Sequence, residues 1–104
     1  LDFTPGEKYT YSNGGYVMLA LIVEKASGQP FPTFLNENIF QPLGMNHTLV
    51  YDESNSEIPK RALGYNMFGE LDDYDILTSG AGGIYSTVGD LFRWDQALYT
   101  DKLR

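Results

Sequence analysis

Cysteine is absent from this chain of 104 residues. Its absence excludes disulfide bonds, thiolate metal sites and cysteine nucleophiles, and it leaves the redox compartment open. Basic residues are scarce as well, because 7 lysines and arginines stand against 14 acidic residues and leave a net charge of −7. Nucleic acids and anionic membranes select for basic surfaces. We therefore expect neither of them as a partner.

The sequence also lacks a long apolar run and a recognisable signal peptide. Its longest apolar run, at residues 16–23, has the length of a helix in a protein core and is too short to cross a bilayer. The chain starts at Leu1 instead of methionine and stops at Arg104, directly after a predicted helix. We therefore expect residues 1–104 to be a single fragment of a larger domain, so the missing signal peptide says nothing about export.

The apolar residues that are present suit one packed unit. They make up 42% of the chain, and aromatic residues make up 14%, as in a globular protein of one domain at most. A first helix is predicted over residues 13–27, with Ser12 or Asn13 as its cap and Gly28 as its end. Residues 16–23 are apolar on every side of that helix, which predicts burial on all sides.

Three further elements follow from local signals. A second helix is predicted over about residues 32–40 and is ended by Pro42 and Gly44. Two short strands are predicted at residues 63–66 and 74–77, with a turn around residues 68–70 between them. The last helix begins near Thr87, and its apolar face is predicted from helical spacing to hold Leu91, Trp94 and Leu98. By the same spacing, Phe92 and Trp94 are assigned to the core.

Several polar clusters have two interpretations. Asp72, Asp73 and Asp75 form an acidic stretch that we assign to a solvated loop, with a divalent cation as the alternative. His47 is the only histidine and has no partner at ligand spacing, so a zinc site is not expected. The glycine-rich turn at residues 80–83 is not a phosphate loop, because no lysine follows it. It is either a flexible or a tightly packed turn, and tight packing is also the plain interpretation of Tyr85.

The residues most suggestive of chemistry are Tyr11, Ser12 and Asn13, which place a phenol and an amide one residue apart where the first helix begins. A tyrosine near a cation can move a proton, and asparagine offers both a donor and an acceptor. The alternative to a catalytic role is a structural one, in which Tyr11 is an aromatic residue of an extended segment and Asn13 caps the helix. No serine–lysine pair accompanies them, because Lys8 precedes Ser12 in a segment that is not helical. Three further serines are interpreted as cap or turn residues: Ser27, Ser79 and Ser86.

Taken together, five motifs in order closely resemble the class C β-lactamase and penicillin-binding-protein family of serine hydrolases. Tyr11 to Asn13 match the second motif of that family. Pro-Gly-Glu at residues 5–7 leads into this motif and belongs to the same match. The other four matches are the end of the first helix (24–28), the Ile-Phe-Gln-Pro-Leu-Gly-Met stretch (39–45), Gly64 with Tyr65, and residues 80–87 leading into Asp90, Leu91, Arg93 and Trp94. The resemblance covers nearly the whole chain and is weakest at residues 52–60.

This resemblance implies a fold and a mechanism. The fold class is mainly α with a small β-hairpin (α+β), the helical region of a β-lactamase/transpeptidase-like fold that is incomplete without its antiparallel sheet. The serine of an upstream Ser-x-x-Lys motif would be acylated. Tyr11 would help to move the proton of that serine or would protonate the leaving group. Asn13 would position the lysine of the motif and the acyl-amide side chain of the substrate. A downstream Lys/His-x-Gly motif would flank the oxyanion site. No metal or cofactor is implied, and residues 80–83 with Tyr85 would lie close to the site.

Several functions stay open on this basis. The parent protein would act on a small amide or ester substrate as a β-lactamase, D-Ala-D-Ala carboxypeptidase, D-aminopeptidase or esterase, while the fragment alone would be inactive because its nucleophile lies elsewhere. The alternative is a non-catalytic relative that binds peptidoglycan or a protein partner, and a third interpretation is an independent helical interaction module. The family suggests a periplasmic or extracellular location. An apolar face separated from its sheet would drive dimerisation or segment exchange.

Overall fold

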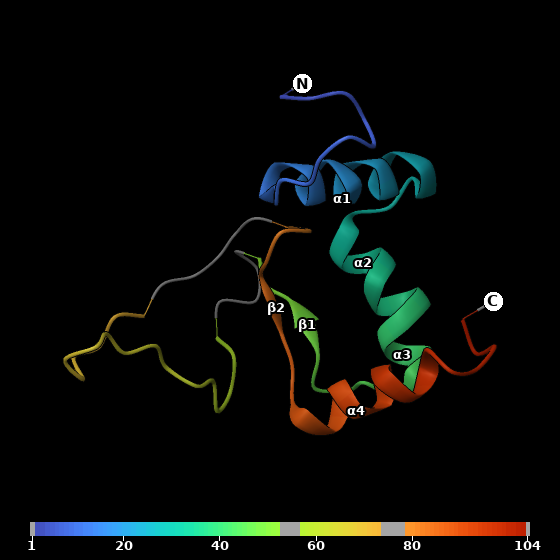
Figure 1. Cartoon of the computed structure of the whole chain (residues 1–104). Coiled ribbons are helices and arrows are strands. Elements are labelled where there is room, and N and C mark those ends of the chain that lie inside the picture. The colour runs from blue at the N-terminus through green and yellow to red at the C-terminus, as the bar shows by residue number, and fades with distance from the viewer. Residues whose placement is uncertain (1, 53–56, 74–78, 104) are drawn as a thin grey trace.

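The computed structural model describes residues 2–52, 57–73 and 79–103 and is mainly helical (Figure 1). Helix α1 spans Asn13–Ser27, as predicted, because its ends carry strong local signals. The Ser12 hydroxyl accepts a hydrogen bond from the Gly15 N–H at 3.1 Å, and Gly28 closes the helix with a φ of 72° in the left-handed region.

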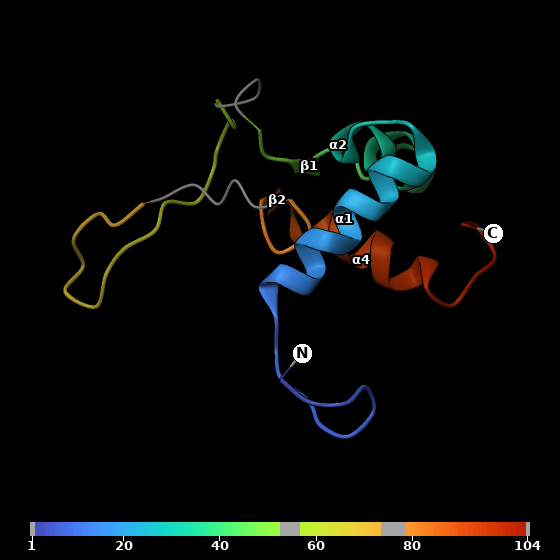
Figure 2. The same ribbon diagram turned by 90° about the horizontal axis from the view of Figure 1, so that it is seen from above.

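The prediction that α1 is buried on all sides is wrong for this structure. Ala20 is its only fully buried residue, and five large apolar side chains of α1 are more than half exposed: Tyr16, Met18, Leu19, Leu21 and Ile22. Figures 1 and 2 show why, since α1 lies at the outside of the molecule, with α2 and β2 on one side of it and only the N-terminal segment on the other in Figure 1. The apolar pattern indicates a helix whose sides should all be packed against other residues, and the described residues pack against only part of its surface.

The second helical region is longer and less regular than predicted. It comprises α2 (Phe31–Leu35), a π-helical turn η1 (Asn36–Phe40) and α3 (Gln41–Leu43) in direct succession. Pro42 lies inside α3, so it does not end the helical region, contrary to the prediction. Gly44 ends the region with a φ of 69°, as predicted.

The strands differ most from the prediction. A two-stranded antiparallel sheet forms between β1 (Leu49–Val50) and β2 (Ile84–Tyr85), with Leu49 opposite Tyr85. The strand predicted at residues 63–66 is reduced to one isolated bridge between Tyr65 and Leu71 around the predicted turn. A short hairpin without a packed face gains little from further pairing. The strand predicted at residues 74–77 lies outside the described residues.

Helix α4 (Val88–Ala97) begins where predicted, with Thr87 as its cap. Its inward positions are Asp90, Trp94 and Ala97, whereas Leu91 and Leu98 are more than half exposed, so the predicted apolar face is only partly right. Phe92, predicted to be core, is 64% exposed because it falls on the outer face. The core lies between α4, β1 and the helical region α2–α3, and it is built from Leu35, Phe40, Leu43, Met45, Val50 and Ala97.

The hairpin at residues 63–72 projects from this body in both views (Figures 1 and 2). Its apolar side chains are largely exposed: Leu63, Tyr65, Met67, Phe68 and Leu71.

Of the helices in the described ranges, none has the length and apolar character that crossing a membrane requires.

Candidate active site

Tyr11 and Asn13 lie on either side of the residue that caps α1. The Ser12 backbone is extended, with a φ of −141° and a ψ of 109°, so Tyr11 precedes the helix and Asn13 is its first residue. Tyr11 is 64% exposed and the Asn13 side chain is also exposed. The local fold therefore places a phenol and an amide together at the solvent-facing N-terminus of α1.

The capping hydrogen bond separates two interpretations of Asn13. Because the Ser12 hydroxyl accepts from the Gly15 N–H, the cap is Ser12 and the amide of Asn13 is not needed for it. Within the described ranges, no hydrogen bond is formed by the Tyr11 phenol or by the Asn13 side chain. Both groups are thus free to contact another molecule or another part of a longer protein.

The glycine-rich turn at residues 80–83 packs through Gly80 against the N-terminal half of α1, at Tyr16 and Ala20. Gly80 has a φ of +90°, and a Cβ on it would come within 2.8 Å of the Ala20 Cβ and would also collide with the Tyr16 carbonyl oxygen. Tyr16 lies one helical turn after Asn13. The interpretation of this turn as tight packing is therefore confirmed, and the turn borders the α1 segment that carries the candidate residues. A role as a wall of the site stays a prediction.

Ser12 and Ser27 act at the ends of α1, as the sequence predicts, whereas Ser86 is neither a cap nor a turn residue, because it follows β2 and pairs with a distant threonine. Ser12 caps α1, the Ser27 hydroxyl accepts from the Gln29 N–H at 3.2 Å, and the Ser86 hydroxyl lies 2.8 Å from that of Thr48. Ser79 belongs to the glycine-rich turn, where it forms a bridge with Gly82. Over the described ranges, no hydrogen bond joins a serine to a lysine. A paired nucleophile therefore does not arise from these residues.

The acidic stretch is used for an ion pair. Asp73 pairs with Arg61 and also accepts a hydrogen bond from the Gly64 N–H at 3.1 Å, whereas Asp72 is exposed. Asp75 lies outside the described residues. No group of three potential metal ligands occurs among the residues placed in the structure. The Asp73 side chain is thus committed to Arg61, which neither the solvated-loop interpretation nor the cation alternative anticipated.

Sequence reasoning missed the buried carboxylate of Asp90 on α4. Asp90 has no exposed surface, and it accepts hydrogen bonds from the Thr48 hydroxyl, from the His47 N–H and from the Arg93 guanidinium, each at 2.8 Å. Burial by itself raises the pKa of Asp90. The hydrogen bonds from Thr48 and His47 and the positive charge of Arg93 outweigh that effect and hold the pKa below its ordinary value.

The available signal for this network was the Thr87–Asp90 spacing, which resembles a capping box. The Asp90 N–H does bond to the Thr87 hydroxyl at 3.2 Å, but the carboxylate turns to Thr48 and His47 and away from the start of the helix. Those partners lie more than 40 residues away in the sequence. Their geometry holds the segment before β1 against α4, so the network is structural.

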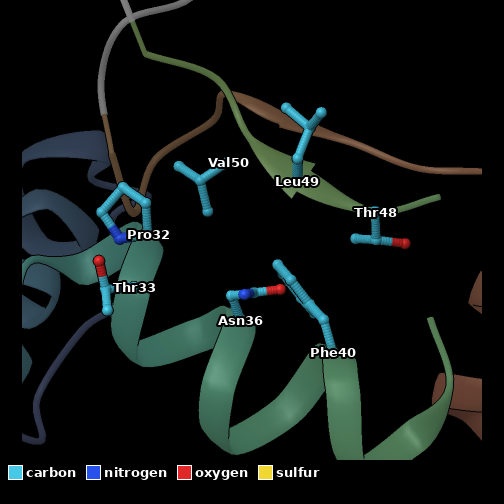
Figure 3. Close-up of a pocket in the computed structure, with 7 residues that line it drawn as sticks. All are labelled: Pro32, Thr33, Asn36, Phe40, Thr48, Leu49 and Val50. Atoms are coloured by element: carbon cyan, nitrogen blue, oxygen red, sulfur yellow. The ribbon is translucent and has the colours of Figure 1, made fainter. Parts of the chain in front are cut away.

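A hollow of about 260 Å³ lies between α2, η1 and β1 (Figure 3). It contains no ionisable side chain, since its lining consists of Pro32, Thr33, Asn36, Phe40, Thr48, Leu49 and Val50. It therefore lacks the groups needed for general acid–base chemistry. The N-terminus of α1 remains the best candidate for a functional site.

Comparisons with known proteins agree with the sequence motifs. A family model described as Beta-lactamase matches residues 1–104. Penicillin-binding protein 4* of Bacillus subtilis (strain 168) is 41% identical over 115 residues, an alignment that covers 95% of this chain and 26% of that protein. The D-alanyl-D-alanine-carboxypeptidase/endopeptidase AmpH of Escherichia coli (strain K12) is 34% identical, with 92% of this chain and 24% of that protein covered.

The solved structures show the same relationship in three dimensions. The D-amino acid amidase from Ochrobactrum anthropi SV3 matches with a TM-score of 0.84 at 29% identity, over 97% of this chain and 31% of that chain. The expected fold, the helical part of a β-lactamase-like fold, is therefore confirmed. This chain spans about a quarter of the length of the two curated relatives. Since the family model matches it from end to end, the chain belongs to the beta-lactamase family.

Proposed function

We propose that this chain is part of a serine hydrolase that cleaves amide or ester bonds through an acyl-enzyme, and that it supplies Tyr11 and Asn13 to the active site. Family membership supports the reaction class. The names of two relatives, a D-alanyl-D-alanine-carboxypeptidase/endopeptidase and a D-amino acid amidase, denote hydrolysis of an amide bond. We therefore expect a small amide or ester, such as a peptide with a D-amino acid, as the substrate.

One observation carries this proposal. The Ser12 hydroxyl caps the helix by accepting from the Gly15 N–H, while the Tyr11 phenol and the Asn13 amide are exposed and without hydrogen bonds within the described ranges. A purely structural Asn at this position would be expected to serve as the cap. A phenol in the segment before α1 and an amide on the first residue of α1 are polar groups that an active site can use, and the fold fixes where that helix begins.

The proposed roles follow from the chemistry of the two groups. Tyr11 transfers the proton of the nucleophilic serine or protonates the leaving group, which requires a nearby cation because a phenol ordinarily keeps its proton at neutral pH. Asn13 bridges that cation, a lysine, and the substrate carbonyl, because its amide both donates and accepts. The N-terminus of α1 adds a positive potential that favours anionic states.

The nucleophile, its lysine and the oxyanion donors are proposed to come from parts of the parent protein beyond residues 1–104. The chain alone is then expected to be inactive. Intact-mass analysis after treatment with a fluorescent penicillin or a fluorophosphonate tests this on the chain and on its full-length parent. Labelling of the parent alone supports the proposal. Labelling of neither favours the non-catalytic alternative, and labelling of the chain itself contradicts the placement of the nucleophile.

Substitutions in the full-length parent test the two roles. Tyr11→Phe and Asn13→Ala are each expected to lower kcat by about 100-fold. Tyr9→Phe is the matched control, because Tyr9 is a more exposed tyrosine in the same segment. Ser12→Ala is the control for the helix end, and it is expected to lower stability by about 1 kcal/mol with little change in kcat. Equal kcat in all four variants would remove Tyr11 and Asn13 from the mechanism.

A further inference from the structure

Contacts made by Arg61 join separate parts of the fold. Its guanidinium donates a hydrogen bond to the Tyr85 hydroxyl at 3.0 Å and forms an ion pair with Asp73. The guanidinium carbon also lies 5.7 Å from the centre of the Tyr85 ring, within the range of a cation–π contact. The Arg61 and Asp73 side chains are only 21% and 17% exposed, so water weakens this pair less than it weakens a surface pair.

The first of these parts is the projecting hairpin at residues 63–72. Backbone hydrogen bonds close it internally, from the Asn66 N–H to the Glu70 carbonyl at 2.9 Å and from the Asp72 N–H to the Gly64 carbonyl at 3.0 Å. Asp73 then accepts from the Gly64 N–H at 3.1 Å while it pairs with Arg61. Through Asp73, Arg61 therefore holds the base of the hairpin in place. The exposed apolar side chains of the hairpin do little to fix the direction in which it projects.

The second part is β2, which leads to the candidate site. Tyr85 is the last residue of β2, and its ring lies 5.7 Å from that of Tyr51 at an angle of 54°. The Tyr51 N–H donates to the Gly83 carbonyl at 2.6 Å. Gly83 closes the glycine-rich turn, and Gly80 in that turn contacts α1 at Tyr16 and Ala20, about one and two helical turns after Asn13. A chain of direct contacts thus runs from Arg61 to the segment that carries the proposed catalytic groups.

We propose that Arg61 is a positioning residue, which holds the hairpin and Tyr85 so that the turn at residues 80–83 keeps its place beside α1 and the substrate. This inference rests on the proposed function. Because the Tyr11 and Asn13 side chains form no hydrogen bond to Arg61 within the described ranges, Arg61 acts on how an extended, peptide-like amide is held and not on proton transfer. Its loss should therefore raise KM for such a substrate and leave acylation by a compact reagent unchanged.

The experiment uses the full-length parent with Arg61→Met, which keeps the apolar stem and removes the donors and the charge. We expect KM for a peptide amide to rise by about tenfold, with kcat and the rate of fluorophosphonate labelling within about twofold of wild type. Arg61→Lys keeps the charge without the planar donor pair and should rescue KM in part. Lys60→Met is the matched control, because Lys60 is an exposed cation beside Arg61.

Tyr85→Phe tests the route of the effect. It removes the acceptor at 3.0 Å and keeps the ring, so it should raise KM less than Arg61→Met does. Combining it with Arg61→Met should add nothing, because both changes break the same contact. Additive effects would place Arg61 and Tyr85 on separate routes and would overturn the inference.

Amide hydrogen exchange at residues 80–83 separates this inference from the proposed function. Arg61→Met is expected to raise exchange there by about tenfold, and Lys60→Met should leave it unchanged. A parent that is not labelled by any reagent refutes the proposed function, while the exchange experiment still tests the positioning. Unchanged exchange, or an unchanged KM in a parent that is labelled, refutes the role of Arg61. A fall in kcat and in labelling together with lowered thermal stability would show a merely structural role.

Discussion

The Asp90 carboxylate accepts a hydrogen bond from the Thr48 hydroxyl at 2.8 Å, although the two residues are 42 positions apart in the sequence. Asp90 is completely buried on α4, and Thr48 immediately precedes β1. A buried charge is tolerated only when it is paired and hydrogen-bonded, and here the His47 N–H and the Arg93 guanidinium complete its shell. The sheet and α4 are thereby held together by a polar contact at the edge of the apolar core.

Replacing Asp90 should be costly for stability. Both Asp90 oxygens accept hydrogen bonds, so in Asp90→Asn the amide nitrogen would face a donor from Arg93 or from Thr48 and His47. The Arg93 charge would also lose its carboxylate partner. We therefore expect the free energy of unfolding to fall by about 3 kcal/mol. Urea unfolding followed by Trp94 fluorescence measures this, because Trp94 packs against the core on the same helix. Asp95→Asn is the matched control at an exposed position of α4 and should cost less than about 0.5 kcal/mol. Similar losses in both variants would contradict a special role for Asp90.

The lowered pKa of Asp90 predicts a definite dependence of stability on pH. The unfolded chain binds the proton near the ordinary value of 3.8, whereas the folded chain binds it only at lower pH. The stabilisation is therefore complete above the ordinary pKa and is lost as the pH falls through the lowered folded pKa. Urea unfolding across this acid range should give a steeper decline in wild type than in Asp90→Asn. Parallel curves would show that Asp90 does not contribute to the decline.

Gly80 is expected to tolerate no side chain. Gly80→Ala would combine a positive φ with a collision against α1, and we expect a loss of about 3 kcal/mol. Gly69→Ala is the matched control, because Gly69 has a φ of +77° and no heavy atom within 4 Å of the position that a methyl group would take. It therefore carries the backbone strain alone, about 1 kcal/mol. The difference between the two free energies of unfolding isolates the packing of the turn on α1. Equal losses would mean that this contact adds nothing.

Signals that act within a few residues were readable from the sequence. Ser12, Gly28 and Thr87 each satisfy or end a helix through atoms no more than four positions away, and the bounds they predict for α1 and for the start of α4 are correct. The pairing of β1 with β2 joins residues about 35 positions apart, and neither strand is long enough to show an alternating pattern. Asp90 was missed for the same reason, because its partners on residues 47 and 48 are distant in the sequence.

The candidate site came from a different kind of information. Tyr11 and Asn13 alone do not reveal chemistry, and it was the order of several motifs along the chain that predicted the family, which is confirmed. The structure adds that Ser12 is the cap, a choice that propensity leaves open because serine and asparagine cap equally well. The roles of Tyr11 and Asn13 stay predictions, since their reaction partners are proposed to lie beyond residues 1–104.

The exposed apolar surface of α1 leads to the last prediction. Five large apolar side chains of α1 are each more than half exposed, and such a surface is rarely left open in a soluble monomer. In the parent we propose that it is covered by the remaining chain, whereas the isolated chain should bury it by associating with a second copy. Sedimentation of the chain at high concentration should therefore show dimers or larger species.

Charges placed on α1 should abolish this association. The double variant Leu19→Lys and Ile22→Lys adds two charges at positions that are 55% and 57% exposed, so folding should be little affected while a shared apolar contact becomes unfavourable. Met67→Lys is the control, because Met67 is 90% exposed on the hairpin and lies off α1. We expect monomers from the double variant and dimers from the control. A monodisperse wild-type monomer would refute the prediction, and dissociation by Met67→Lys alone would move the contact surface from α1 to the hairpin.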